Sequence, residues 1–159
     1  MKKIALIILA LLVGVSAFAK HQKHRKKKKK PVASQISSVT MRRTACYGRC
    51  PDYSVKISSD GGVVYTGMRF VEDSGVYTKN IGAAKAMDII NQFITYRVDT
   101  CANIYHNRIP DLPGMMMTIV YADSTKVIKN AHFGPLYLKG LATSMDEVGK
   151  KSDDSWKKQ

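Results

Sequence analysis

Three cysteines, Cys46, Cys50 and Cys101, are the residues of this chain whose type and spacing point most directly to chemistry. Only three residues, one of them a glycine, separate Cys46 from Cys50, so a bond between the two would close a short loop. In an oxidising compartment such a close pair usually forms a disulfide. We expect a Cys46–Cys50 bridge that leaves Cys101 as a candidate free thiol. A bridge from Cys101 to either of the other two is the alternative pairing.

Two other kinds of cysteine chemistry compete with a structural disulfide. Arg49 lies beside Cys50 and would favour a thiolate, which a thiol–disulfide redox site requires. Redox pairs of the thioredoxin type have only two intervening residues, however, and here the spacing is longer. Together with His106, the three cysteines would offer suitable ligands for zinc, but their spacings match no common zinc module. We therefore expect neither a metal site nor a cofactor.

A long stretch over residues 97–114 holds further side chains with acid–base chemistry. His106 and Asp111 could form an acid–base pair, but no nucleophile motif accompanies them, so we expect no catalytic residues. Long loops on a rigid scaffold often make functional contacts. We therefore combine this stretch with the loop between the close cysteines as one candidate contact loop, formed by Tyr47, Arg49, Tyr105, His106, Arg108 and Asp111.

The N-terminus has the pattern of a secretory signal peptide. Two lysines precede an apolar run over residues 4–15, and Ala17 and Ala19 form a small-x-small cleavage site. We expect residues 1–19 to be removed, which places the protein in the periplasm or outside a bacterium, with no transmembrane segment left. An uncleaved anchor is the alternative, because the basic residues after the run resist translocation. The run is shorter, however, than the ~20 residues that a spanning helix needs.

Positive charge is concentrated just after the predicted cleavage site. Residues 1–30 hold ten of the 26 basic residues and none of the 12 acidic ones, which leaves 16 against 12 in the remainder. We expect residues 20–35 to form a disordered polybasic arm and linker. The arm is either a solvated spacer or an electrostatic tether to an anionic envelope surface, rather than a sequence-specific nucleic-acid reader. Its basic residues are Lys20, Lys23, Arg25, Lys26, Lys27, Lys28, Lys29 and Lys30.

The pattern of apolar residues predicts the elements that position these groups. Alternation and turn residues predict strands over 36–44, 53–58, 63–70, 76–80, 115–121 and 126–130. Helical spacing predicts one helix over 83–94 and a second that begins at Pro135. Hairpin-linked strands imply an antiparallel sheet, so we expect a two-layer α+β domain with the order β-β-β-β-α-β-β-α and both helices on one face. That single domain spans 36–148, and a polar tail covers 149–159.

The stretch from Cys46 to Tyr53, Cys-Tyr-Gly-Arg-Cys-Pro-Asp-Tyr, resembles the opening signature of a bacterial family known as domain of unknown function 6438. The resemblance extends over residues 39–156. Further positions that carry it are Asp60, Gly61, Val64, Tyr65, Gly67, Gly75, Phe93, Asp111, Pro113, Thr118, Lys126, Val127, Pro135 and Trp156. It implies one exported domain and no particular activity, and it assigns no role to Cys101.

These patterns together favour a secreted, non-catalytic binding or cell-envelope interaction module. Its expected partner is an anionic envelope surface or a protein, and its oligomeric state is left open. Two alternatives remain at this point. One is an inhibitor of a secreted hydrolase, which suits a small disulfide-closed domain. The other is a thiol-redox or metal-dependent enzyme that uses Cys46, Cys50 or His106.

Overall fold

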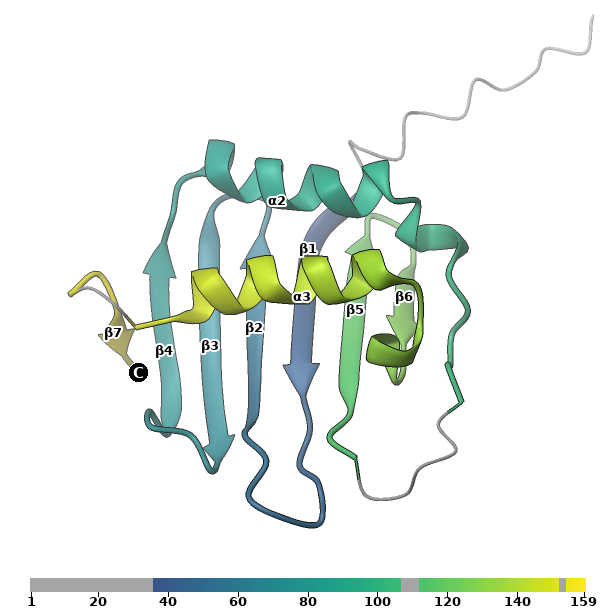
Figure 1. The fold of residues 1–159 in the computed structure, drawn as a ribbon. Helices are drawn as coiled ribbons and strands as arrows, with labels where there is room; N and C mark the ends of the chain where they lie inside the picture. Colours follow the sequence, from purple (N-terminus) through teal and green to yellow (C-terminus); the bar gives the residue numbers. More distant parts are fainter. Residues whose placement is uncertain (1–35, 107–111, 152–153) are drawn as a thin grey trace, which may run out of the picture.

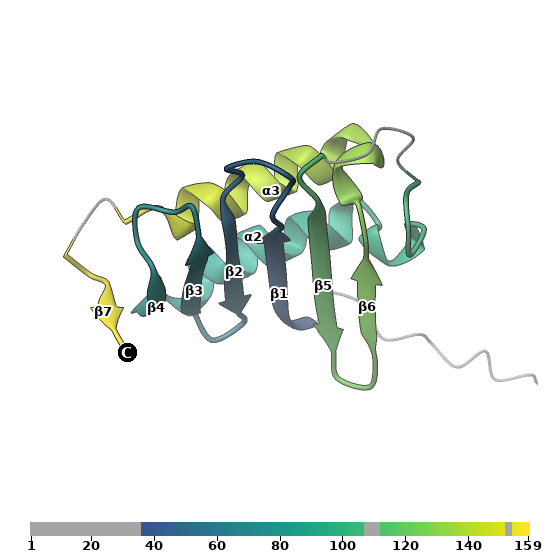
Figure 2. The same cartoon turned by 90° about the horizontal axis from the view of Figure 1, so that it is seen from below.

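A computed structural model describes residues 36–106, 112–151 and 154–159. The chain forms an open antiparallel sheet of seven strands with two α-helices side by side on one face (Figure 1). Seen from below, both helices lie on the same side of the sheet (Figure 2). The predicted two-layer α+β fold is therefore confirmed.

The element bounds follow the predicted ones closely, with the largest changes at strand ends. The strands are β1 (Ile36–Arg43), β2 (Asp52–Ser58), β3 (Gly62–Arg69), β4 (Gly75–Asn80), β5 (Met115–Tyr121), β6 (Thr125–Ile128) and β7 (Lys157–Lys158). The helices are α2 (Ala83–Thr95) and α3 (Leu136–Gly149), and two short 3-10 turns are η2 (Val98–Thr100) and η3 (Ala131–Phe133).

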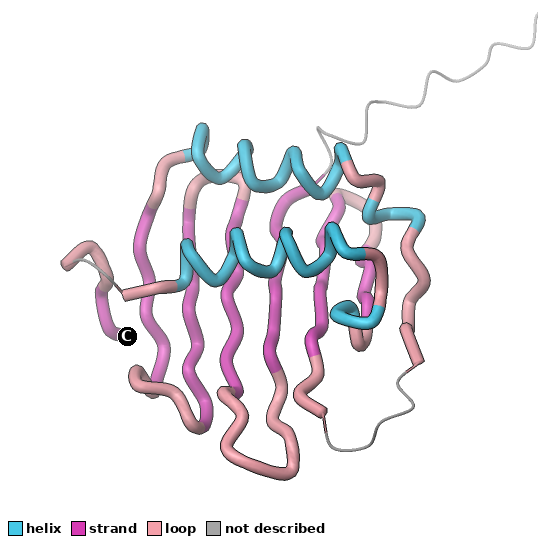
Figure 3. Tube along the Cα trace, viewed as in Figure 1, coloured by secondary structure: helices cyan, strands magenta, loops and turns pink. Residues whose placement is uncertain are grey.

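The strands are ordered β6-β5-β1-β2-β3-β4-β7, so β1 lies between β5 and β2 and joins two hairpin systems. Asp60 and Gly61 form the turn between β2 and β3, where Gly61 has a φ of 97° that favours glycine. All paired strands are antiparallel. The last residues of β1 and β3 therefore lie at the same end of the sheet as the first residues of β2, β4 and β5. The β1–β2 and β3–β4 loops lie at this end (Figure 3).

The core lies between the sheet and the helices. Strand alternation points Val39 and Met41 of β1 toward the helices, and both side chains are fully buried. The two helices contribute their apolar faces, centred on Phe93 in α2 and on Leu138 and Met145 in α3. Each large side chain buried in this way stabilises the fold by ~1.5–3 kcal/mol. The opposite strand positions are polar or only partly buried, and Arg42 pairs there with Asp52.

The C-terminal segment differs from the expected polar tail in one respect. Helix α3 continues to Gly149, and the last residues return to the sheet as β7, paired antiparallel with β4. Trp156 packs on the sheet, with its ring centroid 6.3 Å from that of Tyr65. A two-residue strand has too little alternation to be predicted from sequence, so the count of six strands was one too low.

Within the described ranges, no helix is long and apolar enough to cross a membrane. The predicted signal peptide and polybasic arm lie outside the described residues, as do Arg108 and Asp111 of the candidate contact loop.

Candidate functional site

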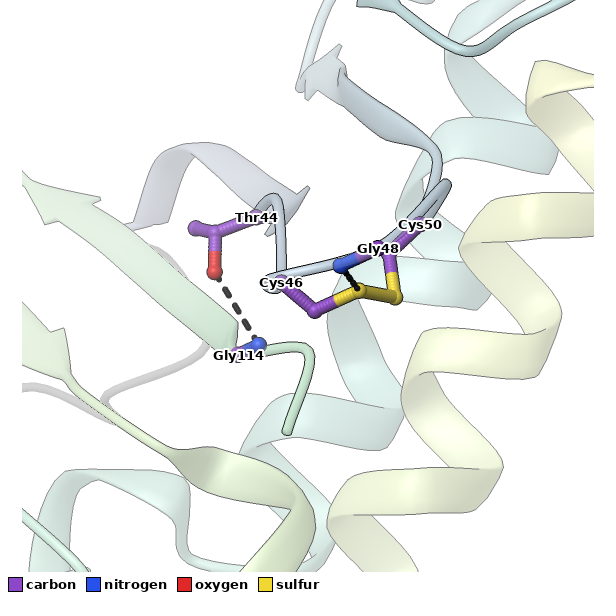
Figure 4. The surroundings of a disulfide bond; sticks show 5 residues. All are labelled: Thr44, Cys46, Gly48, Cys50 and Gly114. Atoms are coloured by element: carbon purple, nitrogen blue, oxygen red, sulfur yellow. Dashed lines mark hydrogen bonds between the residues drawn. A yellow bond between two sulfur atoms is a disulfide. The ribbon is translucent and has the colours of Figure 1, made fainter. Parts of the chain in front are cut away.

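The loop between β1 and β2 is closed by a disulfide between Cys46 and Cys50, whose Cα atoms are 5.5 Å apart (Figure 4). This confirms the predicted pairing. The Gly48 backbone N–H donates to the Cys46 sulfur at 3.3 Å, which further restrains the ring. The two side chains between the bridged cysteines, Tyr47 and Arg49, are both exposed, and 92% of Tyr47 is open to solvent.

Thr44, two residues before Cys46, holds this loop to the start of β5. The Thr44 N–H donates to the Gly114 carbonyl at 3.0 Å, and the Gly114 N–H donates to the Thr44 hydroxyl at 3.0 Å. A Cβ at position 114 would collide with that hydroxyl, so glycine permits the close approach. The end of the 97–114 stretch therefore does adjoin the disulfide loop, as Figure 4 shows.

A three-residue polar cluster lies behind the loop, at the edge of the core. The Arg43 guanidinium donates to Asp146 of α3 at 2.5 Å and to the Tyr53 hydroxyl at 3.1 Å. The Tyr53 hydroxyl in turn donates to Asp146 at 2.6 Å. The bond to Asp146 raises the pKa of Arg43, and burial, with Asp146 beside it, raises the pKa of Tyr53 to about 12. Arg43 and Tyr53 thus keep their ordinary charge states, and the cluster links β1 and β2 to α3.

Sequence reasoning missed this cluster, although a signal for it exists. Arg43 continues the core-facing alternation of Val39 and Met41, so it is a charged residue at an apolar position. Asp146 similarly follows Met145 on the buried side of a helix. Two opposite charges that interrupt two apolar faces are candidates for a pair, because a partly buried charge needs a partner.

A partly open cavity of about 260 Å³ lies between Arg43 and the disulfide loop. It is lined by Arg43, Cys50, Pro51, Pro113, Gly114, Met115 and His132. Both ring nitrogens of His132 are buried and have no hydrogen-bond partner in the described chain. Burial lowers the pKa of His132, and the positive charges of Lys139 and Arg43 lower it further. The imidazole is therefore held in its neutral form.

A larger, more open pocket of about 490 Å³ lies on the other side of the cluster. Tyr53 and Tyr65 of the sheet form its floor, and the C-terminal turn of α3 and the β3–β4 loop form its walls. Gly149 lets α3 approach β2, since a Cβ there would meet the side chain of Val55. Gly67 likewise lets the backbone of Asp73 lie against β3.

The remaining predicted residues lie apart from the disulfide loop. Cys101 is a buried free thiol whose sulfur is 3.2 Å from the Tyr137 hydroxyl. Tyr105 lies near Cys101: its hydroxyl accepts a hydrogen bond from the Ala102 N–H at 3.3 Å, and its ring lies against Gly134. His106 is exposed. The structure therefore divides the candidate contact loop: Tyr47 and Arg49 share one surface, and Tyr105 belongs to a second cluster.

The cysteines also bear on the metal alternative. Cys46 and Cys50 are bonded to each other, and Cys101 is buried elsewhere, so these three side chains do not form a shared ligand set. Among the residues that the structure describes, no group of three His, Cys, Asp or Glu side chains is placed to hold a metal ion.

The fold and these sites define a small α+β domain with a disulfide-closed loop, a cavity beside that loop and a second, more open pocket. The chain belongs to the family described as Domain of unknown function (DUF6438), which matches residues 37–149. The family resemblance is thereby confirmed over most of the predicted range. The comparison with curated proteins finds no match. A function must therefore be argued from the site itself.

Proposed function

We propose that this protein is an exported, non-catalytic binding module that acts at the bacterial cell envelope and docks through its disulfide-closed loop. The observation that carries this proposal is the position of Tyr47, a large aromatic side chain that is 92% exposed on a loop with little freedom to move. Arg49 stands two residues away and is exposed as well.

Tyrosine and arginine are the residue types that contribute most to protein interfaces. An exposed tyrosine on a mobile loop would lose conformational entropy on binding, but the Cys46–Cys50 bridge and the Thr44–Gly114 bonds have already removed much of that freedom. The exposed side chains of this loop can therefore reach a partner, whereas the buried Cys101 cannot.

The second part of the proposal concerns the polybasic arm. Lys20, Lys23, Arg25 and Lys26 to Lys30 precede the domain. Each cation near an anionic surface adds ~1 kcal/mol of attraction, which salt screens within a Debye length. The arm would thus concentrate the domain at an anionic envelope surface, and the loop would supply the specific contact.

Co-sedimentation with isolated envelopes of the host tests both parts, with NaCl varied. Deletion of residues 20–30 should remove the salt-sensitive part of the binding. The double variant Tyr47→Ser with Arg49→Ser should weaken the salt-resistant part by about tenfold, since two central interface side chains are lost. Leu136→Ser with Lys139→Ser, an exposed apolar and cationic pair on α3, is the matched control and should bind normally.

Either part of the proposal can fail independently. Binding that ignores ionic strength, or that survives deletion of residues 20–30, would remove the tether. A loop variant that binds as well as the control pair would remove the docking role of Tyr47 and Arg49.

A second candidate, an inhibitor of a secreted hydrolase, is favoured by the same rigid, protruding loop, because inhibitors present a preorganised segment to an active site. It predicts that secreted hydrolase activity of the host falls when the purified protein is added and that Tyr47→Ser abolishes the effect. Unchanged activity across the host's secreted hydrolases would exclude this role.

A further inference from the structure

The open pocket beside Tyr53 has the charge pattern of a site for a cation. It holds about 490 Å³ and is lined by Tyr53, Tyr65, Glu72, Asp73, Thr143, Asp146, Glu147, Gly149, Lys150 and Lys151. Four of these residues carry carboxylates and two carry ammonium groups, so the lining is net negative. The domain as a whole is mildly basic, so this negative lining is a local feature.

Most of the pocket's charges are already neutralised within the chain. Asp146 is bound by Arg43 at 2.5 Å, and Glu147 is bound by Lys150 at 2.5 Å. Asp73 is bound by Lys151 at 2.7 Å. Glu72 is the lining carboxylate that has neither an ion pair nor a hydrogen bond to any residue in the described ranges. A ligand would therefore meet one unsatisfied negative charge at the rim.

The aromatic side chains around the pocket already receive ammonium groups from the chain itself. The ring centroids of Tyr53 and Tyr65 are 5.7 Å apart, and that of Tyr77 is 6.3 Å from Tyr65. Lys151 places its Nζ 3.7 Å from the centroid of the Tyr77 ring while it donates to Asp73. A tyrosine face beside a carboxylate is thus a combination that holds an ammonium in this protein. Tyr65 and Glu72 both line the pocket, so it contains the same two kinds of group.

Tyr65 gives the pocket a polar contact that is independent of its carboxylates. Its side chain is only 9% exposed, and it lines the pocket. Its hydroxyl makes no hydrogen bond with any described residue, although Tyr53 and Tyr77 beside it both use theirs. The hydroxyl itself is not sealed from solvent, because it reaches the open pocket, so a ligand that donates a hydrogen bond would take the place of water there.

We propose that this pocket binds one cationic group, an ammonium or a guanidinium, with its charge at Glu72, an N–H donated to the Tyr65 hydroxyl, and its apolar stem along the rings of Tyr53 and Tyr65. The cation is carried either by a lysine or arginine side chain of a peptide or by a small free amine. This inference concerns a separate hollow, and it stands whether or not Tyr47 and Arg49 form a docking surface.

The test is an NMR titration of the exported chain with four probes. Three are capped tripeptides, Gly-Lys-Gly, Gly-Arg-Gly and the uncharged Gly-Gln-Gly, and the fourth is 1,4-diaminobutane. The cationic probes should shift the backbone amides of residues 65–73 and 146–151, while the glutamine peptide should leave them unchanged. Stronger binding of a tripeptide than of the diamine would identify a peptide as the source, and the reverse order would identify a free amine.

Two substitutions and a matched control test the assigned contacts. Glu72→Gln should weaken binding of the cationic probe about tenfold, because a charge-assisted hydrogen bond is lost. Tyr65→Phe should weaken it about threefold and leave the fold unchanged, since no described residue bonds its hydroxyl. Glu147→Gln removes an equal charge that Lys150 already neutralises, so it should change the affinity by less than about twofold.

Three outcomes would overturn the proposal. The first is the absence of amide shifts in the pocket at millimolar concentrations of every cationic probe. The second is an equal response to the glutamine peptide, which would show that charge is not recognised. The third is an equal loss of affinity in Glu72→Gln and Glu147→Gln, which would show that only the diffuse negative field matters.

Discussion

Two hollows adjoin the Arg43–Tyr53–Asp146 cluster, one beside Arg43 and one beside Tyr53 and Asp146. They differ in whether their unpaired polar atoms are buried or exposed. The smaller one, beside the disulfide loop, is lined in part by His132, whose buried ring nitrogens have no partner in the described chain. The larger one, over Tyr53 and Tyr65, is open, and its charges are paired except at Glu72.

The two hollows therefore differ in where their unpaired polar atoms lie: those of His132 are buried, and that of Glu72 is exposed. The unsatisfied ring nitrogens of His132 cost free energy in the folded state. The ring also packs against that of Phe133, with 3.9 Å between the ring centroids. Glu72, by contrast, is solvated in the free protein and costs nothing until a ligand displaces water. Changes in the cluster and at His132 should therefore alter stability, and changes at Glu72 and at the Tyr65 hydroxyl should not.

The largest effect on stability is expected from the Arg43–Tyr53–Asp146 cluster. Asp146→Ala should lower the free energy of unfolding by about 2–3 kcal/mol, because Arg43 and Tyr53 both lose their acceptor in a partly buried position. Urea unfolding followed by the fluorescence of Trp156, the only tryptophan, measures this. The matched control is Asp99→Ala, which breaks the exposed pair with Arg97 and should have a much smaller effect.

The disulfide closes one side of the smaller hollow and should have the next largest effect. Cys46→Ser with Cys50→Ser should lower the free energy of unfolding by about 2 kcal/mol, as expected for so short a loop. A reducing agent should destabilise the native protein by a similar amount and leave the double variant unaffected. Equal stability of the two proteins without reductant would show that the Thr44–Gly114 bonds alone hold the loop.

His132 should produce a smaller effect that depends on pH. Its pKa in the folded state is lowered, so the unfolded chain binds more protons as the pH falls below ~6.5. Stability should therefore be complete above that pH and decrease as the pH falls through the lowered value. His132→Leu should flatten this dependence and stabilise the protein at pH 5 by about 1 kcal/mol, because an apolar side chain leaves no unsatisfied nitrogen.

His106→Leu is the control for the pH experiment, because His106 is exposed. It should keep the pH dependence of the native protein. If His132→Leu keeps that dependence as well, other groups set the acid sensitivity, and the contrast between the two hollows is weakened.

The smallest effects should come from the open pocket. Glu72→Gln and Tyr65→Phe should each change the free energy of unfolding by less than about 0.5 kcal/mol, because neither removes a contact of the described chain. Thermal unfolding of both variants checks this. A loss as large as that in Asp146→Ala would mean that the open pocket is part of the core and would remove the distinction between the hollows.

Local patterns were sufficient to predict most of the fold. Alternation in Tyr53, Val55 and Ile57 and the Asp60–Gly61 turn predicted the β2–β3 hairpin, and the spacing of apolar residues up to Phe93 predicted α2. Strand β7 was missed because two residues are too few to show an alternation of apolar and polar side chains. It pairs with β4, next to Trp156, which contacts Tyr65 of β3 and Lys79 of β4.

The candidate site was predicted only where its members are close in sequence. The Cys46–Cys50 bridge follows from a spacing of four residues, and Tyr47 of the candidate contact loop lies between the two cysteines. Tyr105 was assigned to the same contact loop because the sequence shows that a side chain is polar but not which way it points. In the fold, Tyr105 points toward Cys101 and Gly134.

The sequence by itself determined the two-layer class, the hairpins, the helices and the disulfide, because each depends on residues a few positions apart. Only the tertiary structure decided that Arg43 meets Asp146, 103 positions away, and that Gly67 and Gly149 leave a pocket floored by tyrosines. Contacts between distant residues depend on how the helices lie across the sheet. That arrangement is set by packing of the whole core rather than by any local pattern.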